Sequence, residues 1–300
     1  MEQILLSAVA LGLLWAVMTI GVYITYRILG IADLTVEGSI TLGAALCAAM
    51  IRQGADPLLA TAAAFGGGLC AGLVTGLLHT QLKIPALLSG ILSMIALWSV
   101  NLRVMSSPNV SILRMRTVFT PVQELGLSKY MSWIIIGLLL AMGIVTALYW
   151  FFGTELGSAI RATGNNPNMV RAQGINTDSM IIIGLMLSNA LVALSGALIA
   201  QSQAFADIQM GTGSIVIGLA SLIVGEVLFG RHNYYMRLLS LIFGAITYRI
   251  IIAMVMELGM NPNDLKLFTA LTVALALSMP RFGEYLQTLK RSLRRSAQNA

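Results

Sequence analysis

The chain alternates between long apolar stretches and short polar segments. A helix needs about 20 apolar residues, within a range of about 17 to 25, to cross the hydrocarbon core of a bilayer. The stretches that reach this range are Leu5–Tyr26, Pro57–Leu78, Tyr130–Phe152, Met180–Ala200 and Met236–Met256. The shorter stretches are Ile40–Ile51, Pro85–Val100, Ser214–Phe229 and Leu265–Met279. This pattern predicts an all-α integral membrane protein with about nine transmembrane helices, within a range of about eight to ten.

The short stretches are bordered by glycine, proline and polar residues. Such borders are typical of broken or re-entrant helices, because irregular backbone at membrane depth must face protein or a water-filled cavity. We therefore expect the short helices to line the interior of the protein.

The order of long and short stretches is the same on either side of Tyr130–Phe152. The segment Ala32–Gly43 also aligns with Ala206–Gly218, with one inserted residue. An odd number of crossings separates the two copies, so the pattern predicts two inverted-topology repeats. They would cover about 5–101 and about 180–279, joined by a connector helix at 130–152. The alternative is a chance similarity between two helix starts rich in glycine and serine.

Composition agrees with a lipid environment. Hydrophobic residues make up 57% of the chain, charged residues only 10%, and the mean hydropathy is +0.85. Soluble domains carry roughly 25% charged residues. No long polar linker divides the chain, so we expect residues 1–300 to form a single transmembrane domain. The net charge of +6 is concentrated in a basic tail at 280–300, which is typical of an anchor at the cytoplasmic membrane surface and not of a nucleic-acid site.

The basic residues also predict an orientation. With the N-terminus outside and the C-terminus in the cytoplasm, most lysines and arginines fall in the cytoplasm, as the positive-inside rule requires. These residues are Arg27, Lys83, Arg161, Arg171, Arg231, Arg237 and the basic tail. The basic loop 102–129 is an exception, because this orientation places it outside.

No enzyme motif is present in the sequence. It lacks a nucleophile elbow, a His-Glu-x-x-His zinc motif and a phosphate-binding loop. We therefore expect neither catalysis nor a bound cofactor or metal, and ATP would have to be used by a partner subunit.

Polar residues at the two repeated motifs are candidates for a substrate pathway. Carboxylates inside a membrane normally face a cavity or a partner, and the ends of broken helices bind substrates in inverted-repeat transporters. The alternative is that they cap the helices that follow them. The candidates are Asp33, Thr35, Glu37, Asp207, Gln209, Thr212 and Ser214.

Other polar residues within the apolar stretches have simpler interpretations. Asn189 is expected to form hydrogen bonds across helices. Arg249 lies deep in its stretch and must be paired, with Glu226 or a backbone carbonyl as the candidate partner. A stripe of small residues predicts a tightly packed helix face, formed by Ala60, Ala64, Gly68, Gly72 and Gly76.

The segment 153–179 is polar and contains glycine, asparagine and proline residues. It is longer than an ordinary connection between helices, and its middle favours a helix. We expect a short helix there that docks against another protein.

This segment resembles the ATPase-coupling loop of ABC importer permeases in the branched-chain amino acid and ribose permease superfamily. The resemblance is carried by Gly157–Pro167 and Arg171–Asn176, and Asp33–Ser39 is similar to a motif of the sugar members. The runs Gly244–Arg249 and Pro262–Lys266 resemble a narrower group of poorly assigned permeases, for some of which aromatic amino acids are suspected substrates. Carried over by position, the coupling residues would be Arg161, Gly164, Asn165, Asn166, Pro167, Arg171 and Gly174.

The resemblance implies a type II-like ABC importer permease in the plasma membrane of a prokaryote. It implies two ATP-binding subunits, an extracytoplasmic solute-binding protein that would dock on loop 102–129, and a second permease copy. The cargo would be a small solute, with an amino acid as the first candidate and a sugar or nucleoside as the alternative. A different class, the ion-coupled secondary transporter, would have to use Asp33, Glu37 and Asp207 as ion ligands.

Overall fold

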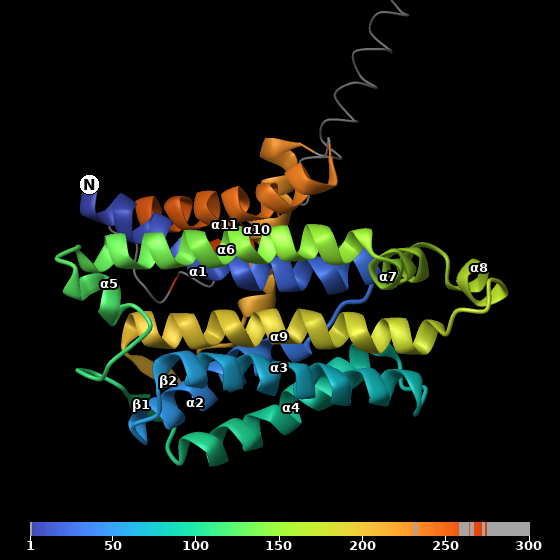
Figure 1. The fold of residues 1–300 in the computed structure, drawn as a ribbon, viewed down its shortest axis with the longest axis horizontal. Helices are drawn as coiled ribbons and strands as arrows, with labels where there is room; N and C mark the ends of the chain where they lie inside the picture. Colours follow the sequence, from blue (N-terminus) through green and yellow to red (C-terminus); the bar gives the residue numbers. More distant parts are fainter. Residues whose placement is uncertain (1, 231–232, 258–263, 265–266, 272–273, 275–300) are drawn as a thin grey trace, which may run out of the picture.

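The computed structural model describes residues 2–230, 233–257, 264, 267–271 and 274. In chain order these residues form α1 (Glu2–Tyr23), a π-helix (Ile24–Leu29), α2 (Thr35–Arg52), α3 (Pro57–Thr80), α4 (Ala86–Met105), β1 (Asn109–Ser111), α5 (Thr120–Glu124), α6 (Lys129–Gly153), α7 (Glu155–Asn165), α8 (Pro167–Ala172), α9 (Thr177–Gln203), β2 (Phe205–Asp207), α10 (Ser214–Phe229) and α11 (Tyr234–Glu257). The long helices lie roughly side by side in one bundle (Figure 1).

Six of the described helices are long and apolar enough to span a membrane, namely α1 with its π-helix, α3, α4, α6, α9 and α11. The faces of α4 and α6 are largely exposed, with large apolar side chains such as Ile95 and Leu139 on the surface. Exposed apolar surface of this extent is stable in lipid and not in water. The expected helical membrane protein is therefore confirmed, apart from a short two-stranded sheet, while the count of about nine helices and the inverted repeats stay predictions.

Two of the stretches that we expected to be short are longer helices in the structure. Helix α4 continues past Val100 to Met105, because the side chain of Asn101 is buried and donates a hydrogen bond to the carbonyl oxygen of Gly38 at 3.1 Å. Helix α2 begins at Thr35, well before Ile40, and has 18 residues. Helix α10 is short as expected, with 16 residues. The stretch Leu265–Met279 lies mostly outside the described residues.

The bundle has two distinct ends (Figure 1). Helices α7 and α8 lie at one end, which we call the α7 end, and β1, β2 and α5 lie at the opposite end, which we call the β end. Strands β1 and β2 pair antiparallel, with Val110 opposite Ala206. At the α7 end Lys83 and Arg171 both contact Asp178, so two predicted cytoplasmic basic residues share one end of the bundle.

Helix α9 is the central helix and packs against α1, α2 and α3. Its contact with α3 uses the small-residue stripe that the sequence predicts. A Cβ atom on Gly68 would overlap the backbone oxygen of Asn189, and one on Gly72 would overlap that of Leu185. The close packing predicted for this stripe is confirmed.

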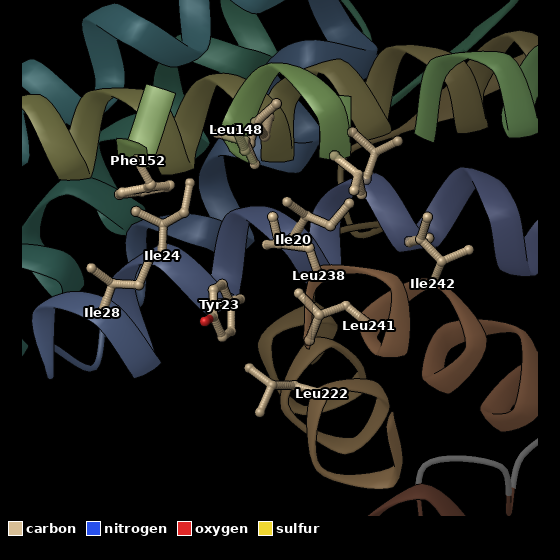
Figure 2. Close-up of a cluster of buried hydrophobic side chains, with 14 of the residues drawn as sticks. Ile20, Tyr23, Ile24, Ile28, Leu148, Phe152, Leu222, Leu238, Leu241 and Ile242 are labelled. Carbon is tan, nitrogen blue, oxygen red and sulfur yellow. The ribbon is translucent and has the colours of Figure 1, made fainter. Parts of the chain in front are cut away.

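On the other side of the bundle, α1 packs against α6, α10 and α11 around an apolar core (Figure 2). Ile20 of α1 and Ile24 of the π-helix lie in this cluster with Leu148 of α6, and Leu222 and Leu238 complete it from α10 and α11. This core joins the segments before and after the connector helix into one unit.

We expect Gly68→Ala to destabilise the protein by about 1 to 3 kcal/mol, because overpacking forces α3 away from α9. Gly66→Ala on the same helix is the matched control, since a Cβ there has nothing within 4 Å and alanine favours a helix. Thermal unfolding in detergent measures both variants. Equal unfolding midpoints would contradict the close contact between α3 and α9.

Candidate translocation path and coupling element

Helix α2 begins with a buried polar network. The backbone N–H of Thr35 donates to Asp33 Oδ1 at 2.9 Å, and Asn189 Nδ2 donates to Asp33 Oδ2 at 2.7 Å. Asp33 is only 2% exposed. This carboxylate therefore accepts from the first residue of α2 and ties it to α9, although the N-cap of α2 is Leu34, which forms no side-chain capping bond.

The network continues into α3 and α4. The hydroxyl groups of Thr35 and Thr75 lie 2.9 Å apart, and Thr75 donates to Ser93 at 2.7 Å. Ser39 donates to Asn189 Oδ1 at 2.7 Å. The prediction that Asn189 bonds across helices is confirmed, and its amide is a central member of the network.

The two similar motifs of the sequence lie against each other. The backbone N–H of Gly213 donates to Glu37 Oε1 at 3.0 Å. Gly213 is the N-cap of α10 and has a φ of 81°, which glycine adopts without strain. Gly211 is so close to α2 that a Cβ atom would overlap the backbone oxygen of Glu37. The starts of α2 and α10 therefore meet inside the bundle.

Beside this meeting point is a cavity of about 460 Å³, a size typical of small-molecule sites. It lies between α2, α4 and the segment before α10, and its lining residues are Glu37, Gly38, Thr41, Met94, Ile95, Trp98, Ser99, Asn101, Ile208 and Thr212. One wall is apolar, from α4, and the opposite side carries a carboxylate and hydroxyl groups. We call it the α2–α4 cavity.

The candidate pathway residues divide into three groups. Glu37 and Thr212 line the α2–α4 cavity. Asp33, Thr35 and Ser214 are buried away from it, and Ser214 Oγ has no hydrogen-bond partner among the described residues. Asp207 and Gln209 lie at the β end.

At the β end Asp207 acts locally. Its Oδ1 accepts from the backbone N–H of Gln209 at 2.7 Å, and its Oδ2 accepts from Asn109 at 3.3 Å. These bonds fix the turn after β2 and the pairing of β2 with β1. The structure does not bring Asp207 to the cavity.

Sequence reasoning did not include the α4 wall among the candidates. Met94 and Trp98 are apolar and resemble any lipid-facing residues, so no local signal distinguishes them. Asn101 was a usable signal, because a polar residue at the end of an apolar helix requires a partner.

Helix α7 is anchored tightly by its glycines. The N-cap Thr154 accepts from the N–H of Gly157 at 3.3 Å. A Cβ on Gly157 would overlap the backbone oxygen of Phe151, and one on Gly164 would overlap that of Ile28. Arg161 stacks its guanidinium over the ring of Tyr234, at 5.3 Å from its centroid. Helix α7 is therefore in backbone contact with the π-helix and α6, and in side-chain contact with α11.

Helix α8 extends furthest from the bundle (Figure 1). Asn166 caps it by accepting from the N–H of Met169 at 3.1 Å, and Pro167 occupies its first turn. Gly174, with a φ of 81°, reverses the chain toward α9. Asn165, Asn166, Pro167 and Met169 are exposed, so this tip is available to a partner. The short helix expected in 153–179 is present as two helices.

Arg171 connects the exposed tip to α9. Its Nε donates to Thr177 Oγ1 at 2.8 Å, and its guanidinium lies 3.7 Å from Asp178. Arg171 thus links α8 to the first turn of α9.

The two charged residues that we considered as a pair have other contacts. Glu226 pairs with Arg27 at 3.1 Å. The guanidinium of Arg249 lies 4.2 Å from the ring centroid of Trp15, a cation–π contact. The expected pairing of Arg249 with Glu226 is therefore wrong, and the ring of Trp15 is the neighbour of Arg249 instead.

A bundle of apolar helices with an interior helix start, a cavity beside it and an exposed helix at one end is typical of a membrane transport protein. Residues 4–277 match the family described as "Branched-chain amino acid transport system / permease component". The chain belongs to this family, and it is a permease component of an ABC-type transporter and not a catalytic enzyme.

Two relatives illustrate the family. The chain is 39% identical over 269 residues to the tyrosine transport system permease protein of Clostridioides difficile (strain R20291), covering 90% of this chain and 88% of that one. It is 29% identical over 188 residues to the ribose import permease protein of Escherichia coli (strain K12), covering 60% and 55% of the two chains. The superfamily inferred from the sequence is confirmed.

A solved structure shares the fold. PsaBC from Streptococcus pneumoniae in complex with Fab superposes with a TM-score of 0.50 over 92% of this chain and 90% of that chain, at 13% identity. At this identity the likeness concerns the fold alone.

We expect Gly164→Ala to loosen α7 from the π-helix, since the added methyl overlaps a backbone oxygen. A cost of about 1 to 3 kcal/mol would raise the undocked population of α7 roughly 5- to 150-fold. The readout is the maleimide labelling rate of Thr163→Cys, a buried position on α7, in a Cys70→Ser background.

Gly153→Ala is the matched control, because a Cβ there has nothing within 4 Å. It should leave the labelling rate unchanged. If Gly164→Ala also leaves it unchanged, α7 does not depend on the contact with Ile28.

Proposed function

We propose that the chain is the transmembrane subunit of an ABC importer for an amino acid, with an aromatic amino acid as the first candidate. The family membership and the exposed α7–α8 element support this function. Two ATP-binding subunits would hydrolyse ATP, a second permease copy would complete the channel, and an extracytoplasmic binding protein would deliver the solute. The protein would lie in the plasma membrane of a prokaryote, with its N-terminus outside and its C-terminus in the cytoplasm.

The coupling role rests on how α7 and α8 are attached. The tip of α8 is exposed, whereas α7 packs against the π-helix, α6 and α9. Closure of an ATPase pair against this tip would push α1 through Gly164 and α9 through Arg171. Stiff contacts of this kind transmit a displacement instead of absorbing it.

Two features support the inverted repeats. The starts of α2 and α10 meet at the contact between Glu37 and Gly213. From there α2 runs to the β end, where its residues Cys47 and Ile51 pack with Val110 of β1, while α10 leads to the start of α11 at the α7 end. Two similar motifs that begin helices of opposite direction are what an inverted repeat requires.

An amino acid fits the chemistry of the α2–α4 cavity. The carboxylate of Glu37 can accept hydrogen bonds from the α-ammonium group, and Asn101 and Thr212 can bind polar atoms. Met94, Ile95 and Trp98 offer an apolar and aromatic surface for a side chain. The similarity to a tyrosine transport permease favours an aromatic substrate over the sugar that the ribose relative would suggest.

The ion-coupled alternative is less well supported. It requires the carboxylates of Asp33, Glu37 and Asp207 to act together. In the structure Asp33 is bonded within the network of α2, Glu37 lines the cavity and Asp207 fixes the turn at the β end. Among the described residues no group of three or more His, Cys, Asp or Glu side chains could hold a metal ion.

Reconstitution of the chain with its ATP-binding subunit and binding protein in proteoliposomes tests the function. We expect uptake of labelled tyrosine that requires both partners. It should also require ATP on the side of the bilayer where the ATP-binding subunits lie. Uptake driven by a sodium or proton gradient without the ATPase would contradict the proposal. Unlabelled amino acids, ribose and nucleosides serve as competitors that define the cargo.

Glu37→Gln should lower tyrosine uptake at low substrate by roughly 10- to 150-fold, because a hydrogen bond to a charged group contributes about 1.5 to 3 kcal/mol. The glutamine oxygen can still accept from the N–H of Gly213, so the helix contact is kept. Glu257→Gln, at an exposed glutamate of α11, is the matched control. Unchanged uptake in Glu37→Gln would exclude this carboxylate from the substrate path.

A further inference from the structure

A second cavity, of about 410 Å³, lies at the α7 end, where α1 with its π-helix, α7 and α11 meet. We call it the arginine cavity. Its lining residues are Tyr23, Arg27, Ile28, Ser158, Arg161, Ala162, Asn165, Tyr234 and Arg237. It is separate from the α2–α4 cavity, with which it shares no residue.

The arginine cavity carries an excess of positive charge. Arg27 is paired with Glu226, whereas Arg161 and Arg237 form no ion pair among the described residues. Arg237 Nε and the hydroxyl of Tyr234 are buried without a hydrogen-bond partner among the described residues. Buried donors of this kind are costly unless a ligand satisfies them, so the cavity has the donors for an anion.

A third cavity, of about 450 Å³, adjoins the arginine cavity and shares Arg161 and Tyr234 with it. Its other lining residues are Tyr149, Trp150, Phe152, Gly153 and Thr154. Trp150 is 74% exposed and Tyr149 is 51% exposed, near the end of α6. Tryptophan and tyrosine at the end of a membrane helix are typical of the level of the lipid headgroups.

We propose that these adjoining cavities bind an anionic phospholipid, with its phosphate in the arginine cavity and its glycerol and upper acyl chain against Tyr149 and Trp150. Arginine binds phosphate oxygens through two parallel N–H groups, and basic pockets between membrane helices bind anionic headgroups. A soluble phosphate would use the same donors, but it would leave the aromatic cavity unused.

Such a lipid would connect three elements, namely α7, α11 and the π-helix. Arg161 belongs to α7, Arg237 to α11 and Arg27 to the π-helix, so one phosphate group contacts three elements. Its binding would stabilise the docked position of α7. The site would exist whether or not α7 couples to an ATPase, and its test needs no transport assay.

Native mass spectrometry and thermal unfolding of the purified full chain, in a neutral detergent, test the site. Phosphatidylglycerol should remain bound and raise the unfolding midpoint, while phosphatidylcholine should do neither. Arg237→Gln should weaken phosphatidylglycerol binding by roughly 10-fold or more, because it removes a charged hydrogen-bond donor. Arg52→Gln, an exposed arginine near the β end, is the matched control and should bind the lipid as the parent chain does.

Arg161→Gln, at a partly exposed position, gives a second reading if Arg237→Gln does not fold. Equal retention of phosphatidylglycerol and phosphatidylcholine would overturn the proposal, as would full retention in either arginine variant. Inorganic phosphate is tested in the same thermal unfolding assay. If it raises the midpoint as much as phosphatidylglycerol does, the occupant is a soluble anion and the lipid assignment is wrong.

Discussion

The hydrogen bonds around Asp33 allow helix α2 to begin part-way along the bundle. A helix start exposes backbone N–H groups, and in lipid each unsatisfied group costs several kcal/mol. Asp33 binds the N–H of Thr35 and is itself held by Asn189 of α9. Asn189 lies within reach because α2 and α9 approach at the level of their backbones, where a Cβ atom on Gly196 would overlap the backbone oxygen of Ile40. The interior polar network and the small-residue packing are therefore one structural device.

The position at which α2 begins determines its contact with α10 and the place of the α2–α4 cavity. It brings Glu37 to the first turn of α10, and it leaves the α2–α4 cavity between Glu37 and the apolar wall of α4. The same bundle fixes α7 against the π-helix that ends α1. A displacement of α7 would thus reach the helix that leads directly into the Asp33 network. This continuity supports the proposal that a partner at the α7 end changes a cavity inside the bundle.

Sequence reasoning succeeded where the signal was local or periodic. The long helices, the tight face of α3 and the helix within 153–179 all follow from residue type and spacing. It failed where a distant partner changed the meaning of a residue. Asn101 extends α4 because Gly38 accepts its hydrogen bond, and Asp207 is bound by Asn109 at the end of the bundle. Neither partner is adjacent in sequence.

By itself, the sequence determined that this chain lies in a membrane. Apolar stretches this long, in a chain with so few charged residues, are stable in lipid and not in water. It also indicated the family, through the resemblance carried by Gly157–Pro167 and Arg171–Asn176, and the family match over residues 4–277 confirms it. Only the tertiary structure decided which polar residues face a cavity. Glu37 lines one and Asp33 does not, although they are four residues apart. The reason is that burial and hydrogen-bond partners come from other helices, whose side chains no local pattern places.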